Sequence, residues 1–205
     1  MFLLFGEVVR INRRLEGMRA CDSCGRSKQF FHVTEVNYFS FFAIPLFPIS
    51  KVADYFLCGG CDTSYASEGQ QLPSHIASVK NVITYILIGY GMAGEVRRMD
   101  QIASAITGGS FSMEEIKNIS YLVSKEDIFE LLGRAASTMN PKAKSGVIEA
   151  AFLSTYLCCE MQYEDRLRIN LMGNVLGLPL PFVEAAIENV RSNNYYGVQR
   201  LIVTI

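Results

Sequence analysis

Four of the six cysteines in this chain form two Cys-x-x-Cys pairs, Cys21 with Cys24 and Cys58 with Cys61. Each pair places two thiolates on one tight turn, and the small residues nearby let backbone amides face the sulfurs. Four thiolates complete a tetrahedral shell and leave no open position for water or substrate. The pattern therefore predicts one Zn²⁺ ion in a structural rather than a catalytic site.

Two other interpretations of these cysteines stay open at the level of sequence. Four thiolates also bind iron, either alone or in an iron–sulfur cluster. A Cys-x-x-Cys pair can also be a thioredoxin-like redox site, although no βαβ pattern surrounds either pair here. The 33 residues between Cys24 and Cys58 exceed the spacing of the most compact ribbons. A metal would therefore connect the two ends of a long segment of β-strands.

The composition describes a protein with ample material for a core. Of the 205 residues, half are apolar and 19% are charged, and the formal net charge is −1. A disordered chain is excluded, and no global electrostatic footprint for nucleic acid is present. Nucleic-acid or polymerase association through a ribbon remains an alternative, but the sequence does not favour it.

The apolar segments are short. The run from Met1 to Gly6 is about half the length of a signal peptide's apolar region, so we expect no secretion signal. The stretch Val82 to Gly94 has thirteen residues, against about twenty needed to span a bilayer. We therefore expect a cytoplasmic protein that does not cross the membrane, although contact with a membrane surface stays open.

The first third of the chain is predicted to form short antiparallel strands. Residues 2–11, 29–36 and 55–57 are rich in β-branched and aromatic side chains. Residues 44–49 contain two prolines, which cannot donate to a central ladder, so this segment should be a rigid extended loop or an edge. The aromatic run from Tyr38 to Phe56 either fills a small core or forms an exposed apolar patch for a partner.

The rest of the chain is predicted to be helical. Ser112 with Glu115 has the spacing of a capping box, and Asn140 precedes a proline suited to a first helical position. Apolar residues then recur three and four positions apart. These signals predict helices at 75–92, 95–107, 113–122, 125–138, 141–160, 164–177 and 181–190. A terminal strand is expected at 198–205, with the possibility that it pairs with the ribbon.

Residues 1–65 resemble the zinc-ribbon 15 family. The resemblance rests on the opening run from Met1 to Gly6, the two cysteine pairs, the pair Tyr38-Phe39 and the element Phe-x-Ile-Pro-Leu-Phe-Pro-Ile ending at Ile49. The sequence lacks a proline after Cys21, a departure that leaves the ligand set unaffected. The resemblance implies a four-cysteine zinc ribbon with no assigned activity.

Residues 75–191 resemble, more distantly, the TerB-like helical fold of tellurite-resistance proteins. That fold commonly carries an acidic Asp-Gly turn in each of two related halves. The corresponding turns here begin at Ala93 and at Cys159, and both lack the aspartate. The acidic residues that the resemblance leaves as candidates for a second metal site are Glu95, Asp100, Glu160 and Glu164.

Together these features predict an α+β protein with an antiparallel zinc ribbon at 1–65, a linker at 66–73, a TerB-like helical domain at 74–191 and a terminal strand or tail at 192–205. Common catalytic templates are absent from the sequence. We therefore expect a non-enzymatic interaction module that binds a partner protein or a second copy of itself through apolar surface. The alternative is a metal-sensing or enzymatic site in the helical part.

Overall fold

The computed structural model describes residues 5–67 and 74–201, and these form two compact units. The first contains the described residues up to Ser74 together with the short segment Ser137–Asn140. The second contains His75–Ala136 and the described residues from Pro141 onward. One unit is built on a sheet and the other on helices, which confirms the predicted α+β class.

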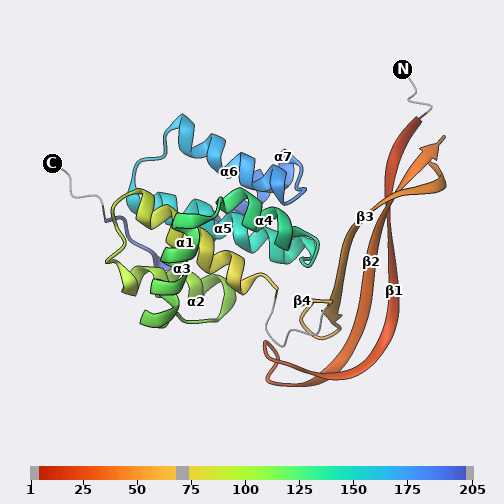
Figure 1. Cartoon of the computed structure of the whole chain (residues 1–205), viewed down its shortest axis with the longest axis horizontal. Helices are drawn as coiled ribbons and strands as arrows, with labels where there is room; N and C mark the ends of the chain where they lie inside the picture. Colours follow the sequence, from red (N-terminus) through yellow and green to blue (C-terminus); the bar gives the residue numbers. More distant parts are fainter. Residues whose placement is uncertain (1–4, 68–73, 202–205) are drawn as a thin grey trace. The chain divides into compact units, whose positions relative to one another are not determined.

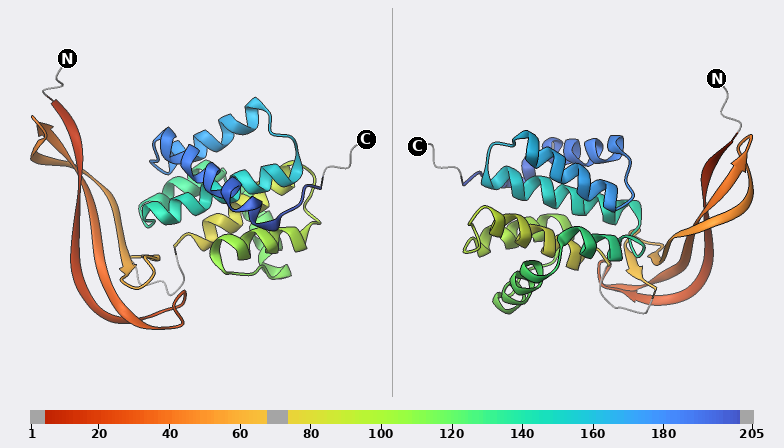
Figure 2. Two further views of the ribbon diagram at one scale, coloured as in Figure 1. Left: turned by 180° about the vertical axis from the view of Figure 1, so that it is seen from behind. Right: turned by 45° about the horizontal axis from the view of Figure 1, so that its top comes forward.

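The first unit is an antiparallel sheet with the strand order β1-β2-β3-β4. Its strands are β1 (Phe5–Cys21), β2 (Arg26–Phe41), β3 (Ile44–Cys58) and β4 (Ser64–Ala66). Figures 1 and 2 show the first three as one long, curved and twisted ribbon. The cysteines lie at one end of this ribbon, while the β2–β3 turn and the start of β1 lie at the other.

The three long strands extend well beyond the predicted segments. Polar residues and Gly17 interrupt the apolar pattern of β1, yet pairing with β2 continues to Cys21. A register shift between Leu15 and Gly17 makes this continuation feasible, because Gly17 adopts a φ of 105° that glycine reaches at little cost. Cross-strand pairing thus overrides the local propensity from which the short strands were predicted.

The proline-containing segment lies at an edge of the sheet, as its sequence predicts. Pro45 pairs with Ser40 and Pro48 with Tyr38, and register shifts occur on both sides of these positions. Because β4 pairs only with Tyr55–Leu57, the rest of β3 has β2 as its one neighbour in the sheet.

The second unit consists of helices whose ends fall within three residues of the predicted ones. Its described helices are α1 (Ile76–Gly89), α2 (Val96–Thr107), α3 (Met113–Lys125), α4 (Ile128–Ala136), α5 (Pro141–Cys158), α6 (Tyr163–Val175) and α7 (Leu180–Ser192). Helix α5 runs through the middle of this unit and packs against α1, α2, α6 and α7 (Figures 1 and 2). Small and apolar residues cover α5 on nearly every side, which is typical of a central core helix.

Two predicted boundary segments differ from the structure. Ala66 was assigned to a linker, but it is buried and belongs to β4, while 68–73 lie outside the described residues. The predicted strand at 198–205 does not form over 198–201, and 202–205 lie outside the described residues. A 3₁₀ turn at Asn194–Gly197 precedes this segment, and the N–H of Leu201 donates to the carbonyl of Leu157 in α5.

Within the described residues, no single helix is both long and apolar enough to cross a membrane. Helices α6 and α7 meet the length and composition criteria only as a pair, and they are bent by 119° at their junction.

Helix α3 begins with the predicted capping box. The Ser112 hydroxyl accepts from the Glu115 N–H at 3.1 Å, and the Glu115 carboxylate accepts from the Ser112 N–H at 2.8 Å. We expect Ser112→Ala to lower the free energy of unfolding of the helical unit by about 1 kcal/mol, because it leaves a helix N–H without its cap. Urea unfolding followed by circular dichroism measures this, with the exposed Ser110→Ala as the control. An equal effect of both variants would contradict the capping role.

Candidate metal centre and apolar surfaces

The four cysteines come together at one end of the sheet. Cys21 ends β1 and Cys58 ends β3, so the pairing of these strands with β2 carries both thiols to the same edge. Cys24 lies in the β1–β2 turn and Cys61 in the turn before β4. Cys21 and Cys58 are fully buried, whereas Cys24 and Cys61 are partly exposed.

The sulfur atoms have the geometry of a tetrahedral metal site. The Cys21 and Cys61 sulfurs are 3.6 Å apart, those of Cys24 and Cys58 are 3.9 Å apart, and all four lie within 4.8 Å of one another. A tetrahedron with Zn–S bonds of about 2.3 Å has edges of about 3.8 Å. The donor set and its spacing therefore fit a Zn²⁺ ion.

Hydrogen-bond donors surround the two sulfurs of the second pair. The Gly60 N–H donates to the Cys58 sulfur at 3.4 Å, and the Thr63 hydroxyl lies 3.1 Å from the Cys61 sulfur. An added Cβ at Gly59 would lie 2.9 Å from the Phe31 ring and 3.1 Å from the Gln29 carbonyl oxygen, so a larger residue there would force its neighbours to shift. Donors of this kind stabilise thiolates and orient them toward a metal.

Tyr65 is a member of this site that the sequence did not single out. Its ring is 4% exposed, its hydroxyl lies 3.3 Å from the Cys21 sulfur, and it accepts from the Asp22 N–H at 3.2 Å. The ring also packs on Phe30 at 5.4 Å between centroids. Tyr65 is the last residue of the predicted ribbon, and nothing but its position four residues after Cys61 marks it in the sequence.

The crowding of four thiols shifts their acidities in opposite directions. A hydrogen bond with Cys61 and burial raise the pKa of Cys24 to about 12. Burial acts in the same direction on Cys61, but hydrogen bonds from Thr63 outweigh it and lower the pKa of that thiol to about 7. Without a cation only part of the cluster can ionise, whereas a bound Zn²⁺ lets all four act as thiolates.

The four acidic candidates occupy separate places in the helical unit. Glu95 precedes α2, and Asp100 accepts from the Phe111 N–H at 2.8 Å. Glu160 is exposed and lies 3.6 Å from Arg200, while Glu164 is exposed in the first turn of α6. Within 5–67 and 74–201, the four cysteines are the one group with ligand atoms close enough to share an ion. Metal binding by the acidic residues stays a prediction.

The buried carboxylate of this region is Asp165, beside the predicted Glu164. It is 6% exposed and accepts from the Tyr90 hydroxyl and, at 3.0 Å, from the Gln162 N–H. The Cys159 thiol lies 3.6 Å from the same carboxylate. Asp165 therefore caps α6 and ties it to α1. The Gln162-x-x-Asp165 spacing of a capping box is the signal that sequence reasoning missed.

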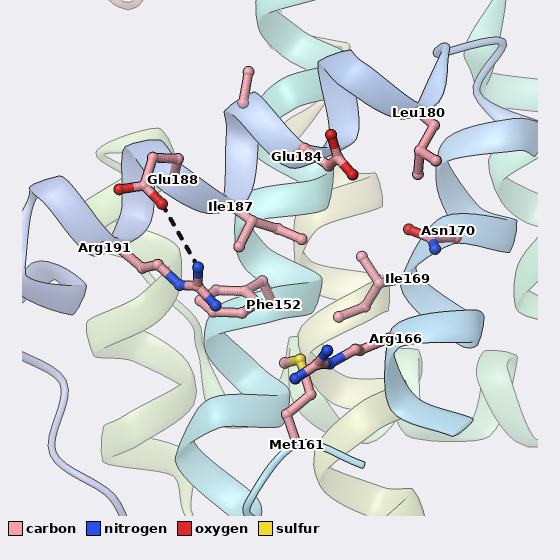
Figure 3. Close-up of a pocket in the computed structure, with 11 residues that line it drawn as sticks. Phe152, Met161, Arg166, Ile169, Asn170, Leu180, Glu184, Ile187, Glu188 and Arg191 are labelled. Carbon is pink, nitrogen blue, oxygen red and sulfur yellow. Dashed lines mark ion pairs between the residues drawn. The ribbon is translucent and has the colours of Figure 1, made fainter. Parts of the chain in front are cut away.

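A groove opens between α5, α6 and α7 (Figure 3). Phe152 and Ile169 contribute apolar surface to the groove. Leu180 lies at the end of the groove opposite Phe152. The Arg191 guanidinium lies 3.6 Å from Glu188 and 5.6 Å from the centre of the Phe152 ring, which leaves a charged rim around the apolar surface. The volume of the groove is about 630 Å³. A groove of this character can receive an apolar side chain or a helix face.

The aromatic run from Tyr38 to Phe56 divides between two environments. Tyr55 packs with Val33, Ala53 and Leu57 in a buried cluster on the sheet. The large apolar residues nearer the β2–β3 turn remain exposed, with 62% of Ile44 and 59% of Phe42 accessible. The run is therefore buried in one part and exposed in the other, and binding of a partner by the exposed part stays a prediction.

A zinc-ribbon family model, Zn_ribbon_15, matches residues 19–97. The match begins two residues before Cys21, includes all four cysteines and the β2–β3 hairpin, and ends in the first turn of α2. The predicted zinc-ribbon resemblance is confirmed over the shared range 19–65. Neither the curated proteins nor the solved structures include a match to this chain. The TerB-like resemblance of the helical unit therefore stays a prediction.

Proposed function

We propose that this protein is a non-enzymatic interaction module whose ribbon is held by one structural Zn²⁺ ion. The zinc-ribbon match and the tetrahedral sulfur geometry support the metal. Exposed apolar surfaces of the ribbon and of the groove between α5, α6 and α7 bind the partner. We place the protein in the cytoplasm, because a reducing compartment keeps four thiols available for zinc.

The exposed apolar end of the ribbon is the observation that carries this proposal. Soluble proteins rarely leave a contiguous apolar patch uncovered unless something binds it. Seven exposed large apolar residues lie at this end, on β1 and β3 and in the turn between β2 and β3: Phe5, Val9, Phe42, Ile44, Leu46, Phe47 and Ile49. Four more continue along β1 and β3: Ile11, Leu15, Met18 and Val52.

Zinc and the apolar end have separate tasks in this proposal. Four protein thiolates saturate the ion, so it fixes the strands at the cysteine end and takes no substrate. The same strands continue without interruption to the apolar end. The metal therefore maintains the scaffold on which the binding surface is presented.

Elemental analysis combined with binding assays tests this function. We expect one zinc per chain, and we expect Phe42→Ser/Phe47→Ser to lose association with partner, second copy or lipid while it keeps the zinc. The matched control, Leu167→Ser/Leu171→Ser, removes two exposed apolar residues from α6 instead. Two metal ions per chain, with the second lost on Glu160→Ala, would favour the enzymatic or sensing alternative. Salt-dependent retention on a generic oligonucleotide would favour nucleic-acid binding.

A further inference from the structure

The end of the β2–β3 hairpin is long, apolar and free of charge. We define the apex as residues 38–50, thirteen consecutive residues without a single charged side chain. Large exposed side chains lie on both sides of its turn, with exposed fractions of 59% for Phe42, 62% for Ile44, 56% for Leu46 and 55% for Phe47. Such a surface in water is unfavourable unless it has an occupant.

Most of the large apolar side chains of the apex lie on one face of the sheet. Phe5, Phe39, Phe41 and Phe47 lie on one face of the sheet, where Phe39 and Phe47 stack at 5.1 Å between ring centroids. Leu46 occupies an extra position where the register shifts, so it adds apolar surface outside the regular alternation. These side chains, together with Phe42 in the turn, form the apolar surface that the apex presents.

The turn itself places a bulky apolar residue where glycine is favoured. Phe42 has a φ of 50° and Ala43 a φ of 61°, in a two-residue connection between Phe41 and Ile44. Such turns favour Asn-Gly or Gly-Gly, because positive φ is unfavourable for bulky residues. A phenylalanine at the outermost point is kept despite this strain, and such strain clusters at functional positions.

Basic residues encircle the ribbon behind the apex. We define the basic collar as Arg10, Arg13, Arg14 and Lys51. Arg10 and Lys51 both lie opposite Val36 of β2, and Arg13 lies three residues further along β1, opposite Val33 and on the other face of the sheet. Val36 lies five positions before Phe41 in β2, a distance of about 17 Å along the strand.

The acidic residues near the collar already have partners within the ribbon. Glu7 accepts from the Asn37 amide at 2.5 Å, and Glu35 accepts from the Tyr55 hydroxyl at 2.7 Å. Asp54 binds Lys51 and His32, and Glu16 lies 3.6 Å from Arg14, so two of the four collar residues are paired with a carboxylate of the ribbon. Within the described part of the chain, Arg10 and Arg13 form no ion pair. Their guanidinium groups therefore remain available to anions.

We propose that the apex inserts into the interfacial region of an anionic lipid bilayer, with Arg10 and Arg13 of the basic collar bound to the lipid headgroups. Interfacial amphipathic helices bury their apolar face about 5–10 Å deep at the headgroup boundary, and we expect a similar depth for the apex. Flexible arginine and lysine side chains bridge the remaining distance to the headgroups. Shallow insertion also keeps the unpaired backbone groups of the sheet edges out of the hydrocarbon. This inference rests on the proposed interaction function and names lipid as the partner.

A tryptophan introduced at the apex tests the insertion directly, because the chain contains none. We expect the emission of Phe47→Trp to shift to shorter wavelength with vesicles of phosphatidylserine and phosphatidylcholine, and brominated lipid tails to quench it. The control variant Tyr163→Trp reports from an exposed site on α6 and should show neither effect. A shift in the control alone would assign membrane contact to the α6–α7 pair and overturn the proposal.

Vesicle sedimentation then separates the two parts of the surface. Phe42→Ser/Phe47→Ser should reduce binding at least tenfold, and Arg10→Gln/Arg13→Gln should reduce it about fivefold for each charge removed. Zinc content checks that each variant keeps its folded ribbon. Equal binding to pure phosphatidylcholine would overturn the role of the collar.

The remaining outcomes distinguish this inference from the proposed function. If no vesicle binds but the chain self-associates through the apex, or retains a protein through it, lipid is the wrong partner and the interaction function stands. Light scattering of the wild type and of Phe42→Ser/Phe47→Ser decides the first case. A chain that binds no vesicle, remains monomeric and retains no protein contradicts both proposals.

Discussion

Cys58→Ser is expected to abolish zinc binding and to unfold the cysteine end of the ribbon. Cys58 is fully buried, and its sulfur lies 3.9 Å from the Cys24 sulfur. The other three thiols of the group are themselves ligands, so none of them can replace it. Structural zinc contributes an apparent binding free energy of about 10–16 kcal/mol, all of it available only to the folded state. The buried cluster at this end contains little besides two cysteines, Phe30 and Tyr65.

Elemental analysis and hydrogen–deuterium exchange measure the two parts of this result. Zinc should fall from one equivalent to none, and the backbone amides at the ends of β1 and β3 and in β4 should lose their protection. Chelation of the wild-type protein should have the same effect. Cys159→Ser is the control, because that thiol lies in the helical unit. Retention of one zinc by Cys58→Ser would contradict the four-thiolate site.

Asp165→Asn is expected to lower the free energy of unfolding of the helical unit by about 2–3 kcal/mol. The carboxylate is buried and accepts hydrogen bonds from Tyr90 and from the Gln162 N–H, and Arg168 lies 3.8 Å away. An amide reproduces the size of the carboxyl group, but it cannot accept with both of its terminal atoms. Urea unfolding at neutral pH measures the loss, and the exposed Glu164→Gln provides the control.

The same carboxylate makes stability depend on pH. Burial alone would raise the pKa of Asp165, but the hydrogen bonds from Tyr90 and Gln162 outweigh it and hold the pKa below its ordinary value. A carboxyl group with a lowered folded pKa stabilises the protein above its unfolded pKa of about 4, and this contribution is lost as the pH falls through the folded value. Asp165→Asn should therefore flatten the acid side of the stability profile. An unchanged acid limb would show that other carboxylates control it.

The helices and the metal ligands could be predicted because their signals are local. The box from Ser112 to Glu115 and the pair Asn140-Pro141 set helix starts through contacts made within one turn. Two Cys-x-x-Cys turns likewise define the ligands within four residues each. These signals do not depend on tertiary contacts, so they can be recognised from the sequence alone.

The lengths of the strands and the supporting residues of the sites could not be predicted, because both depend on partners distant in sequence. β1 continues past Gly17 only because β2 lies beside it. Tyr65 reaches the Cys21 sulfur across 44 positions, and Tyr90 reaches Asp165 across 75. Which aromatic residues are covered follows from tertiary packing, and no periodicity in 38–56 distinguishes Tyr55 from Phe47.

The prolines of β3 have a consequence for solubility. A long, apolar edge strand is a template on which further strands can add, and such growth leads to aggregation. Pro45 and Pro48 lie where β3 has β2 as its one neighbour in the sheet, and a proline has no N–H to offer an incoming strand. Their two rigid rings therefore interrupt the row of donors that a fibril would need. The apolar apex can thus remain exposed with less risk of stacking edge to edge.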